Sequence, residues 1–359
     1  MKEILLRRPH LRLPGESLSG KRFVAAPDFK LQPGIGPAGW TPLGLVSIPA
    51  GSESSIDWKD FEIVGHSGLD PNHADPMISQ AVGLHVEGVR DLHLQNGVFK
   101  SLPRVGILCA GVNGLEIEDC HSERTEGLLR ADYFVTTPRA EPAINSGIHL
   151  HGHCTHRNGQ GGGKSPGFES LLHEGEIGSS AINAYCVDSE FADLAAVGEN
   201  KAVLKLAVPQ RVHVRRCIGG AIMLQGSFYW NATDGPNTTI SPGVEALFAL
   251  GPKAIAADNW IEDCVLKHDL NLWRSRGMGN LIQLSYPQVR THVRGGHLWV
   301  PRDAPYCAIQ CAEGVDAEIR NVTFHGPAER ALHMGDSAPA AWPSRTNPDW
   351  RTANQFVRE

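Results

Sequence analysis

Three short phrases decide the fold of this chain: GLHVEG at 83–88, GILCAG at 106–111 and GIHLHG at 147–152. The first two begin 23 residues apart, and the third begins 41 residues after the second, which is one period plus about 18 residues. A second phrase, VRDLHL at 89–94, returns as VNGLEI at 112–117 at the same interval. Short alternating runs that repeat between glycines at this period are typical of a solenoid.

Alternation within the phrases separates interior from exterior side chains. In the first phrase Leu84 and Val86 point inward, whereas His85 and Glu87 point outward. Each coil of a solenoid pairs its backbone with the next at about 4.8 Å, so we predict parallel sheets. If the third phrase occupies the same position two coils later, His149 lies roughly 10 Å from His85.

Composition and charge restrict the class of protein. The chain has 359 residues, of which 41% are hydrophobic, and its 39 glycines and 24 prolines suit many turns. The net charge of −6 argues against a general nucleic-acid surface. Charged residues follow the N-terminus before any long apolar run, and no segment approaches the roughly 18 apolar residues of a membrane span. We therefore expect a cytoplasmic protein, or a secreted one if a signal peptide has been removed.

The regular pattern does not cover the whole chain. Residues 1–57 carry scattered prolines and predict an irregular N-terminal cap, residues 58–336 form the solenoid, and residues 337–359 form a polar C-terminal tail. Two long insertions, at about 121–145 and 154–180, interrupt the coils. Insertions in solenoids collect on one face, which is often the binding face.

Three cysteines recur at one position of the repeat. Cys120, Cys217 and Cys264 each close a similar phrase, and no C-x-x-C pair is present. Free cysteine behaves as a small buried hydrophobe, so we predict cysteines stacked in the interior.

The pattern resembles a known superfamily. In VRDLHLQNGVF at 89–99, GLEIEDC at 114–120 and AEIRNVTF at 317–324, the chain resembles the right-handed parallel β-helix, the pectate-lyase-like superfamily. The resemblance covers roughly residues 58–335 and implies an all-β fold. Its members include polysaccharide lyases, glycoside hydrolases, uronate epimerases, fructan transferases and phage tailspikes, most of which grip a sugar chain along one sheet. The aspartate patterns of polygalacturonases and pectate lyases are absent, so the resemblance assigns no catalytic residue.

A run of histidines between the two insertions is the first candidate site. Alternation places His149, His151 and His153 on one strand face, and the phrase repeat adds His85 and Glu87. Imidazoles exchange protons near neutral pH. We therefore predict acid–base roles for the histidines of the two phrases and substrate contacts for Glu87 and His153. A solvated face with ordinary histidines remains the alternative.

The same histidines also suit a metal. Histidines at alternate positions of a strand can bind zinc or a transition metal, usually with a further histidine or carboxylate. A divalent metal at His149, His151 and His153 is therefore a second hypothesis for this strand.

Two carboxylates form a rival site. Asp188 and Glu190 share one strand face at about 6.5–7 Å, and glycoside hydrolysis needs two carboxyl groups at such a separation. A lyase or epimerase would instead need a base and a cation that binds the substrate carboxylate. Tyr229 and Arg215 suit those roles, and Trp230 suits stacking on a sugar ring or capping of the core.

These patterns predict a carbohydrate-active enzyme of the polysaccharide lyase or glycoside hydrolase type, which cleaves or rearranges a glycan by acid–base catalysis in a groove on the β-helix. A non-catalytic, tailspike-like glycan-binding protein and an epimerase or cyclase of a small metabolite remain alternatives. The expected partner is an oligosaccharide or polysaccharide, with no nucleic acid and no membrane, and a homo-oligomer is left open.

Overall fold

The computed structural model describes most of the repeat. The described residues are 1–30, 43–49, 55–66, 68–69, 81–102, 105–110, 113–124, 133–136, 145–151, 155–158, 168–170, 186–197, 202–207, 209–225, 230–231, 235–236, 256–267, 280–285, 288–312, 314–335 and 344–358. Within these ranges the elements are strands, apart from one short 3₁₀ helix, η2 (Ala328–Arg330). The described part of the chain holds no helix with the length and apolar character needed to cross a bilayer.

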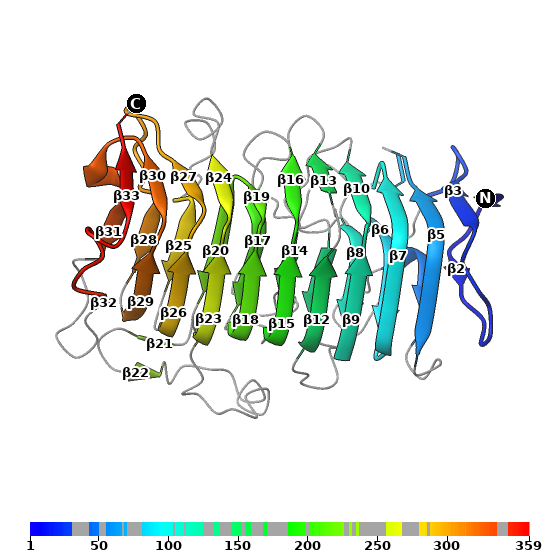
Figure 1. Cartoon of the computed structure of the whole chain (residues 1–359). Coiled ribbons are helices and arrows are strands. Elements are labelled where there is room, and N and C mark those ends of the chain that lie inside the picture. Colours follow the sequence, from blue (N-terminus) through cyan, green and yellow to red (C-terminus); the bar gives the residue numbers. More distant parts are fainter. Residues whose placement is uncertain are drawn as a thin grey trace.

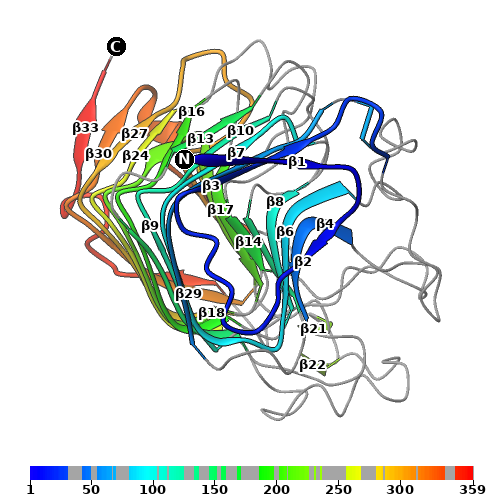
Figure 2. The same ribbon diagram turned by 90° about the vertical axis from the view of Figure 1, so that its right-hand side faces the viewer.

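The strands stack into a parallel β-helix, which confirms the predicted fold class. Each coil contributes a strand to each of three ladders, and the ladders surround one core (Figures 1 and 2). The ladders pair parallel throughout, and the short hairpin of β21 (Trp230–Asn231) and β22 (Gly235–Pro236) is antiparallel.

The first ladder, called face 1 here, carries the candidate site. Its strands are β5 (Ile56–Val64), β7 (Arg90–Lys100), β9 (Asn113–Glu118), β12 (Asn145–His151), β15 (Cys186–Ala192), β18 (Pro209–Arg215), β23 (Ala256–Glu262), β26 (Gln288–Arg294), β29 (Val315–Arg320) and β32 (Arg345–Thr346).

Face 2 adjoins face 1. The long strands β5 and β7 bend at the shared corner and belong to both faces. The other strands of face 2 are β1 (Lys2–Leu6), β3 (Lys21–Ala25), β10 (His121–Arg124), β13 (Thr155–Asn158), β16 (Ala195–Val197), β19 (Ile218–Gly219), β24 (Val265–Lys267), β27 (His297–Trp299), β30 (Thr323–His325) and β33 (Gln355–Val357).

Face 3 is a separate sheet that closes the cross-section. It comprises β2 (His10–Leu11), β4 (Leu43–Ile48), β6 (Ala81–Glu87), β8 (Val105–Ala110), β11 (Tyr133–Thr136), β14 (Phe168–Ser170), β17 (Ala202–Ala207), β20 (Ala221–Gln225), β25 (Ile282–Ser285), β28 (Ile309–Cys311) and β31 (Leu332–Met334).

The corner between faces 1 and 2 is a left-handed backbone bend that recurs in successive coils. Asp119, Asp193, Arg216 and Asp263 have φ values of 49°, 58°, 51° and 53° there. Short polar side chains tolerate this region better than most, and glycine tolerates it best. The next coil uses Gly295, at φ 63°, where a Cβ atom would lie 2.0 Å from the Asp263 Oδ1 atom. The corner therefore requires glycine at this coil.

The core is built from columns of inward side chains. Val214, Ile261, Val293 and Ile319 lie in register on neighbouring strands of face 1 and are buried. Cys120, Cys217 and Cys264 are also buried, and the six cysteines whose side chains are described are free thiols. The predicted interior position of these three cysteines is confirmed.

The stacking extends beyond residues 58–336. Residues 1–57, for which we expected an irregular cap, supply β1 to β4 and the beginning of β5. Residues 337–359, for which we expected a tail, supply β32 and β33, which pair with β29 and β30. The domain boundaries at 57 and 336 therefore fall within continuous ladders.

The predicted neighbourhood of His85 and His149 is wrong. GLHVEG and GILCAG both lie on face 3, where His85 is in register with Leu108. GIHLHG instead lies on face 1, where His149 is in register with Glu116. The extra residues before the third phrase contain β11, and β11 takes the face 3 position of that coil. The similarity reflects a common strand pattern between glycines rather than a common place in the coil.

Candidate active site

Six alternating acidic and imidazole residues cross face 1 in register. The acid–imidazole row consists of Asp57, His93, Glu116, His149, Glu190 and His213, one from each of six neighbouring strands. Parallel strands lie about 4.8 Å apart, so the row spans roughly 24 Å. Its members alternate with buried residues along their strands, as Glu190 does between Ser189 and Phe191, and therefore point away from the core.

One end of the row surrounds a histidine with carboxylates. His93 Nδ1 lies 3.4 Å from Asp57 Oδ1. His93 Nε2 lies 3.6 Å from Glu118 Oε2 and 4.0 Å from Glu116 Oε2. Glu118 is held by a 2.8 Å hydrogen bond from Gln95 Nε2. His93 Nε2 is shielded from solvent and forms no hydrogen bond, although two carboxylates lie within 4.0 Å of it.

The centre of the row places a histidine between two glutamates. His149 is exposed, and its register partners are Glu116 on one side and Glu190 on the other. Two strand spacings separate the glutamate backbones by about 9.6 Å. Arg215, on the next strand, forms an ion pair with Glu190. The centre therefore combines two half-buried carboxylates in different surroundings with an imidazole between them.

Beyond His213 the register continues into an aromatic stack. Trp260 lies 4.5 Å from His213 and 5.3 Å from His292 between ring centroids, with interplanar angles of 11° and 16°. Imidazoles therefore cover both faces of the indole. A sugar ring has no free face of Trp260 on which to stack, so the stack forms one side of the site rather than a binding platform.

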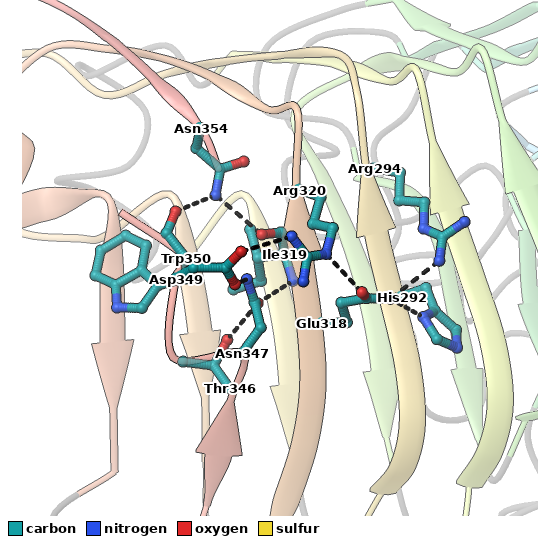
Figure 3. A network of polar contacts seen from close by, with 10 residues as sticks. All are labelled: His292, Arg294, Glu318, Ile319, Arg320, Thr346, Asn347, Asp349, Trp350 and Asn354. Atoms are coloured by element: carbon teal, nitrogen blue, oxygen red, sulfur yellow. Dashed lines mark hydrogen bonds and ion pairs between the residues drawn. The ribbon is translucent and has the colours of Figure 1, made fainter. Parts of the chain in front are cut away.

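A network of ion pairs extends along face 1 from β26 across β29 to Asp349, which follows β32 (Figure 3). Glu318 accepts hydrogen bonds from His292 at 2.8 Å, Arg294 at 3.0 Å and Arg320 at 2.6 Å. Arg320 also donates to Asp349 at 2.8 Å. The hydrogen bonds from Arg320, Arg294 and His292 lower the pKa of Glu318 to about 2.

The two halves of face 1 differ in charge. Among the described exposed or half-buried residues of β5 to β15, seven are acidic and three are basic. The acidic residues are Asp57, Asp60, Asp91, Glu116, Glu118, Asp188 and Glu190, and the basic residues are Lys59, Arg90 and Lys100. The outward arginines of β18, β26 and β29 are each ion-paired with a carboxylate: Arg211 with Asp188, Arg215 with Glu190, Arg290 with Asp258, and Arg294 and Arg320 with Glu318. The described part of the face thus offers no excess of positive charge to an anionic polymer.

The structure brings together three of the predicted site residues. His149, Glu190 and Arg215 meet at the centre of the row. His151 lies on the same strand in register with Glu118, and nothing of its side chain is described.

Asp188 lies apart from this centre. Its φ of 49° breaks the regular alternation, and its carboxylate accepts two hydrogen bonds from Arg211, at 2.5 and 2.9 Å. The hydrogen bond from Arg211 lowers the pKa of Asp188. Asp188 and Glu190 therefore do not form the predicted pair on one face of a regular strand.

His85 and Glu87 lie on face 3, away from the row. His85 is only 7% exposed, and burial lowers its pKa to about 4, so it is neutral near pH 7. His153 and Tyr229 lie outside the described residues, and Trp230 is described only as part of the β21 backbone. Within the described ranges no three potential ligands gather to hold a metal, and the metal hypothesis for His149, His151 and His153 stays a prediction.

Sequence reasoning missed four members of the row: Asp57, His93, Glu116 and His213. The repeat contained a usable signal for two of them, because His93 and Glu116 occupy the same position in VRDLHL and VNGLEI. Asp57 and His213 lie outside those phrases and become neighbours of the row only through strand pairing.

No protein-family model and no curated protein matches the sequence. Among solved structures, the chain is similar to the catalytic domain of a GH87 alpha-1,3-glucanase in complex with nigerose, with 10% identity and a TM-score of 0.42. That match covers 99% of this chain and 62% of the glucanase chain, so this chain spans less than two thirds of it. The receptor binding domain of the siphovirus 9NA tailspike matches with 10% identity and a TM-score of 0.34, covering 99% of this chain and 70% of that one. Likeness at this level says nothing about the activity of the chain.

Proposed function

We propose that this chain is a glycoside hydrolase whose acid–base pair is Glu116 and Glu190, with His149 between them. The observation that carries the proposal is the register Glu116–His149–Glu190 across three neighbouring strands. Inverting glycoside hydrolases place their two carboxyl groups about 6.5–9.5 Å apart, which leaves room for a water molecule. The backbone separation of about 9.6 Å allows the two side chains to lean into that range.

The surroundings of the two glutamates support a different role for each. Glu190, paired with Arg215, is the carboxylate that takes a proton from water as the water attacks the anomeric carbon. Glu116 gives its proton to the leaving glycosidic oxygen, and the nearby His93 can return one. His149 faces the sugar between them and hydrogen-bonds its hydroxyl groups.

The charges of face 1 favour an uncharged glycan as the substrate. A uronate polymer would meet the acidic half of the face, where seven carboxylates outnumber three basic side chains among the described exposed or half-buried residues of β5 to β15. Lyase chemistry also needs a cation for the substrate carboxylate, and Arg215 is already paired with Glu190. These two features favour hydrolysis over elimination.

The test is turnover of a panel of uncharged polysaccharides, measured as new reducing ends, by the wild type and by Glu116→Gln, Glu190→Gln and His149→Ala. Loss of an acid or base lowers the rate by about 10²–10⁴-fold. Asp188→Asn is the matched control, since Asp188 lies on the Glu190 strand but pairs outside the row. NMR of the first product should show inversion. Full activity of both glutamine variants would contradict the proposal, as would an unsaturated product from a uronate polymer.

Glycan binding without cleavage is the second candidate. The satisfied ion pairs of Glu318 and the covered faces of Trp260 favour it, because those groups hold the surface rigid rather than react. Retention of an uncharged polysaccharide by the wild type with no new reducing ends would support this candidate instead.

A further inference from the structure

A second group of rings lies on face 2, around the corner from the acid–imidazole row. Trp299 of β27 is in register with His325 of β30, and their rings stack at 4.3 Å with an interplanar angle of 6°. His297 lies two residues before Trp299, and its Nδ1 atom is 3.0 Å from His325 Nε2. The three side chains point outward, since Leu298 and Phe324 between them are buried.

Trp299 differs from Trp260 in what covers its indole. Trp260 has an imidazole on each face, whereas Trp299 stacks on His325 and, at 5.4 Å and 27°, on His297. The His297 ring lies only 5.3 Å from the His325 ring, so both imidazoles lie on the same side of the indole. On the opposite side the register partner of Trp299 is the exposed Lys267 of β24. In the described part of the chain no second ring and no cation–π contact covers that side of the indole.

The surroundings of Trp299 select an uncharged sugar ring over a cation. An indole face attracts both the apolar C–H face of a hexose and an organic cation. Lys267 on the open side repels a cation, and its ammonium group can donate hydrogen bonds to hydroxyls. The hydrogen-bonded imidazoles of His297 and His325 fix the indole and supply further donors and acceptors at its edge.

We propose that Trp299, His297 and His325 form a second glycan-binding site on face 2, which takes an uncharged hexose unit and takes no part in bond cleavage. The site rests on its own rings and contacts and does not require the hydrolase proposed for face 1. The site would hold a polysaccharide beside the acid–imidazole row while face 1 acts on another segment of the same polysaccharide.

Fluorine NMR of the protein labelled with 5-fluorotryptophan tests the site directly, because each tryptophan contributes its own resonance. The Trp299→Phe variant assigns the Trp299 signal, and an analogous variant assigns Trp260. The probes are soluble uncharged gluco-, manno- and xylo-oligosaccharides and, separately, tetramethylammonium. We expect a saturable shift of the Trp299 signal with a saccharide, while the covered Trp260 shifts less.

Affinity for the matching polysaccharide provides the second measurement. Trp299→Ala should weaken binding about tenfold, and Trp299→Phe should restore part of it. Ile218→Ala is the control, because Ile218 is an apolar residue of face 2 with 55% exposure and no ring. In a Glu190→Gln background the Trp299 shift should persist, which separates this site from the hydrolase. A Trp299 signal unmoved by the saccharides, or moved by tetramethylammonium alone, would overturn the proposal, as would equal affinities for the wild type and Trp299→Ala.

Discussion

Protonation of Glu318 should weaken the last coils of the β-helix in a pH window set by this one carboxylate. In the folded protein its pKa is about 2, against an ordinary value of 4.5, because Arg320, Arg294 and His292 donate hydrogen bonds to it. A carboxylate whose pKa is lower in the folded state than in the unfolded state contributes its full stabilisation at pH values above the unfolded-state pKa. That stabilisation is lost as the pH falls from about 4.5 to about 2.

The size of the effect follows from the shift and the exposure. A difference of about 2.5 pH units at 1.36 kcal/mol per unit sets a ceiling of about 3 kcal/mol. The Glu318 side chain retains 29% of its exposure, so water and salt screen its ion pairs. We therefore expect about 1 to 1.5 kcal/mol to be realised in the free energy of unfolding.

The assay compares the wild type with Glu318→Gln. Because coils of a solenoid can open one after another, hydrogen exchange of the β29 and β30 amides is a sharper readout than global unfolding. The variant should exchange faster near pH 7, and the difference from the wild type should vanish as the pH approaches about 2. Glu329→Gln is the matched control, since Glu329 is exposed on the same coil and has no ion pair within the described residues. Equal exchange in wild type and Glu318→Gln near pH 7 would refute the reasoning.

Two further predictions concern buried polar groups. Burial lowers the pKa of His85 to about 4 from 6.5, so the folded state loses stability as the pH falls from about 6.5 to about 4. His85→Gln should remove that pH dependence in urea titrations, and a wild-type unfolding midpoint constant across the window would argue against it. Asn259 is fully buried, accepts from Val212 N at 3.2 Å and donates to the Pro209 carbonyl at 2.9 Å. Asn259→Leu leaves both backbone groups unpaired and should cost about 2 to 4 kcal/mol in urea unfolding, whereas a cost below about 0.5 kcal/mol would show that the core satisfies them otherwise.

The candidate site could be predicted only in part. The histidine run pointed to His149, and the carboxylate cluster DSEFAD at 188–193 pointed to Glu190, so both residues could be predicted from the sequence. Glu116 and His93 share a repeat position, which is a usable signal, but the phrase repeat alone assigns neither residue a catalytic or binding role. The site depends on side chains from strands far apart in sequence, such as Asp57 and His213, and pairing alone brings these to one face.

Local pattern fails where the backbone leaves its regular alternation. Alternation predicts that Asp188 shares a face with Glu190, but a left-handed φ turns its carboxylate toward Arg211. The same conformation recurs at Arg211, Asp258 and Arg290, at φ values of 54°, 55° and 53°. Arginine carries no sequence signal for such a bend, and aspartate, which tolerates the left-handed region better than most residues, marks it far less clearly than glycine.

By itself, the amino-acid sequence determined the parallel β-helix, because inward alternation and glycine turns at a 23-residue interval are local features that each coil repeats. Tertiary structure alone decided which residues become neighbours across the coils. His85 and His149 occupy similar phrases but lie on different faces, because β11 falls within the extra residues between them. Backbone hydrogen bonds between coils set the register. Because the insertions differ in length, this register cannot be predicted from the sequence period alone.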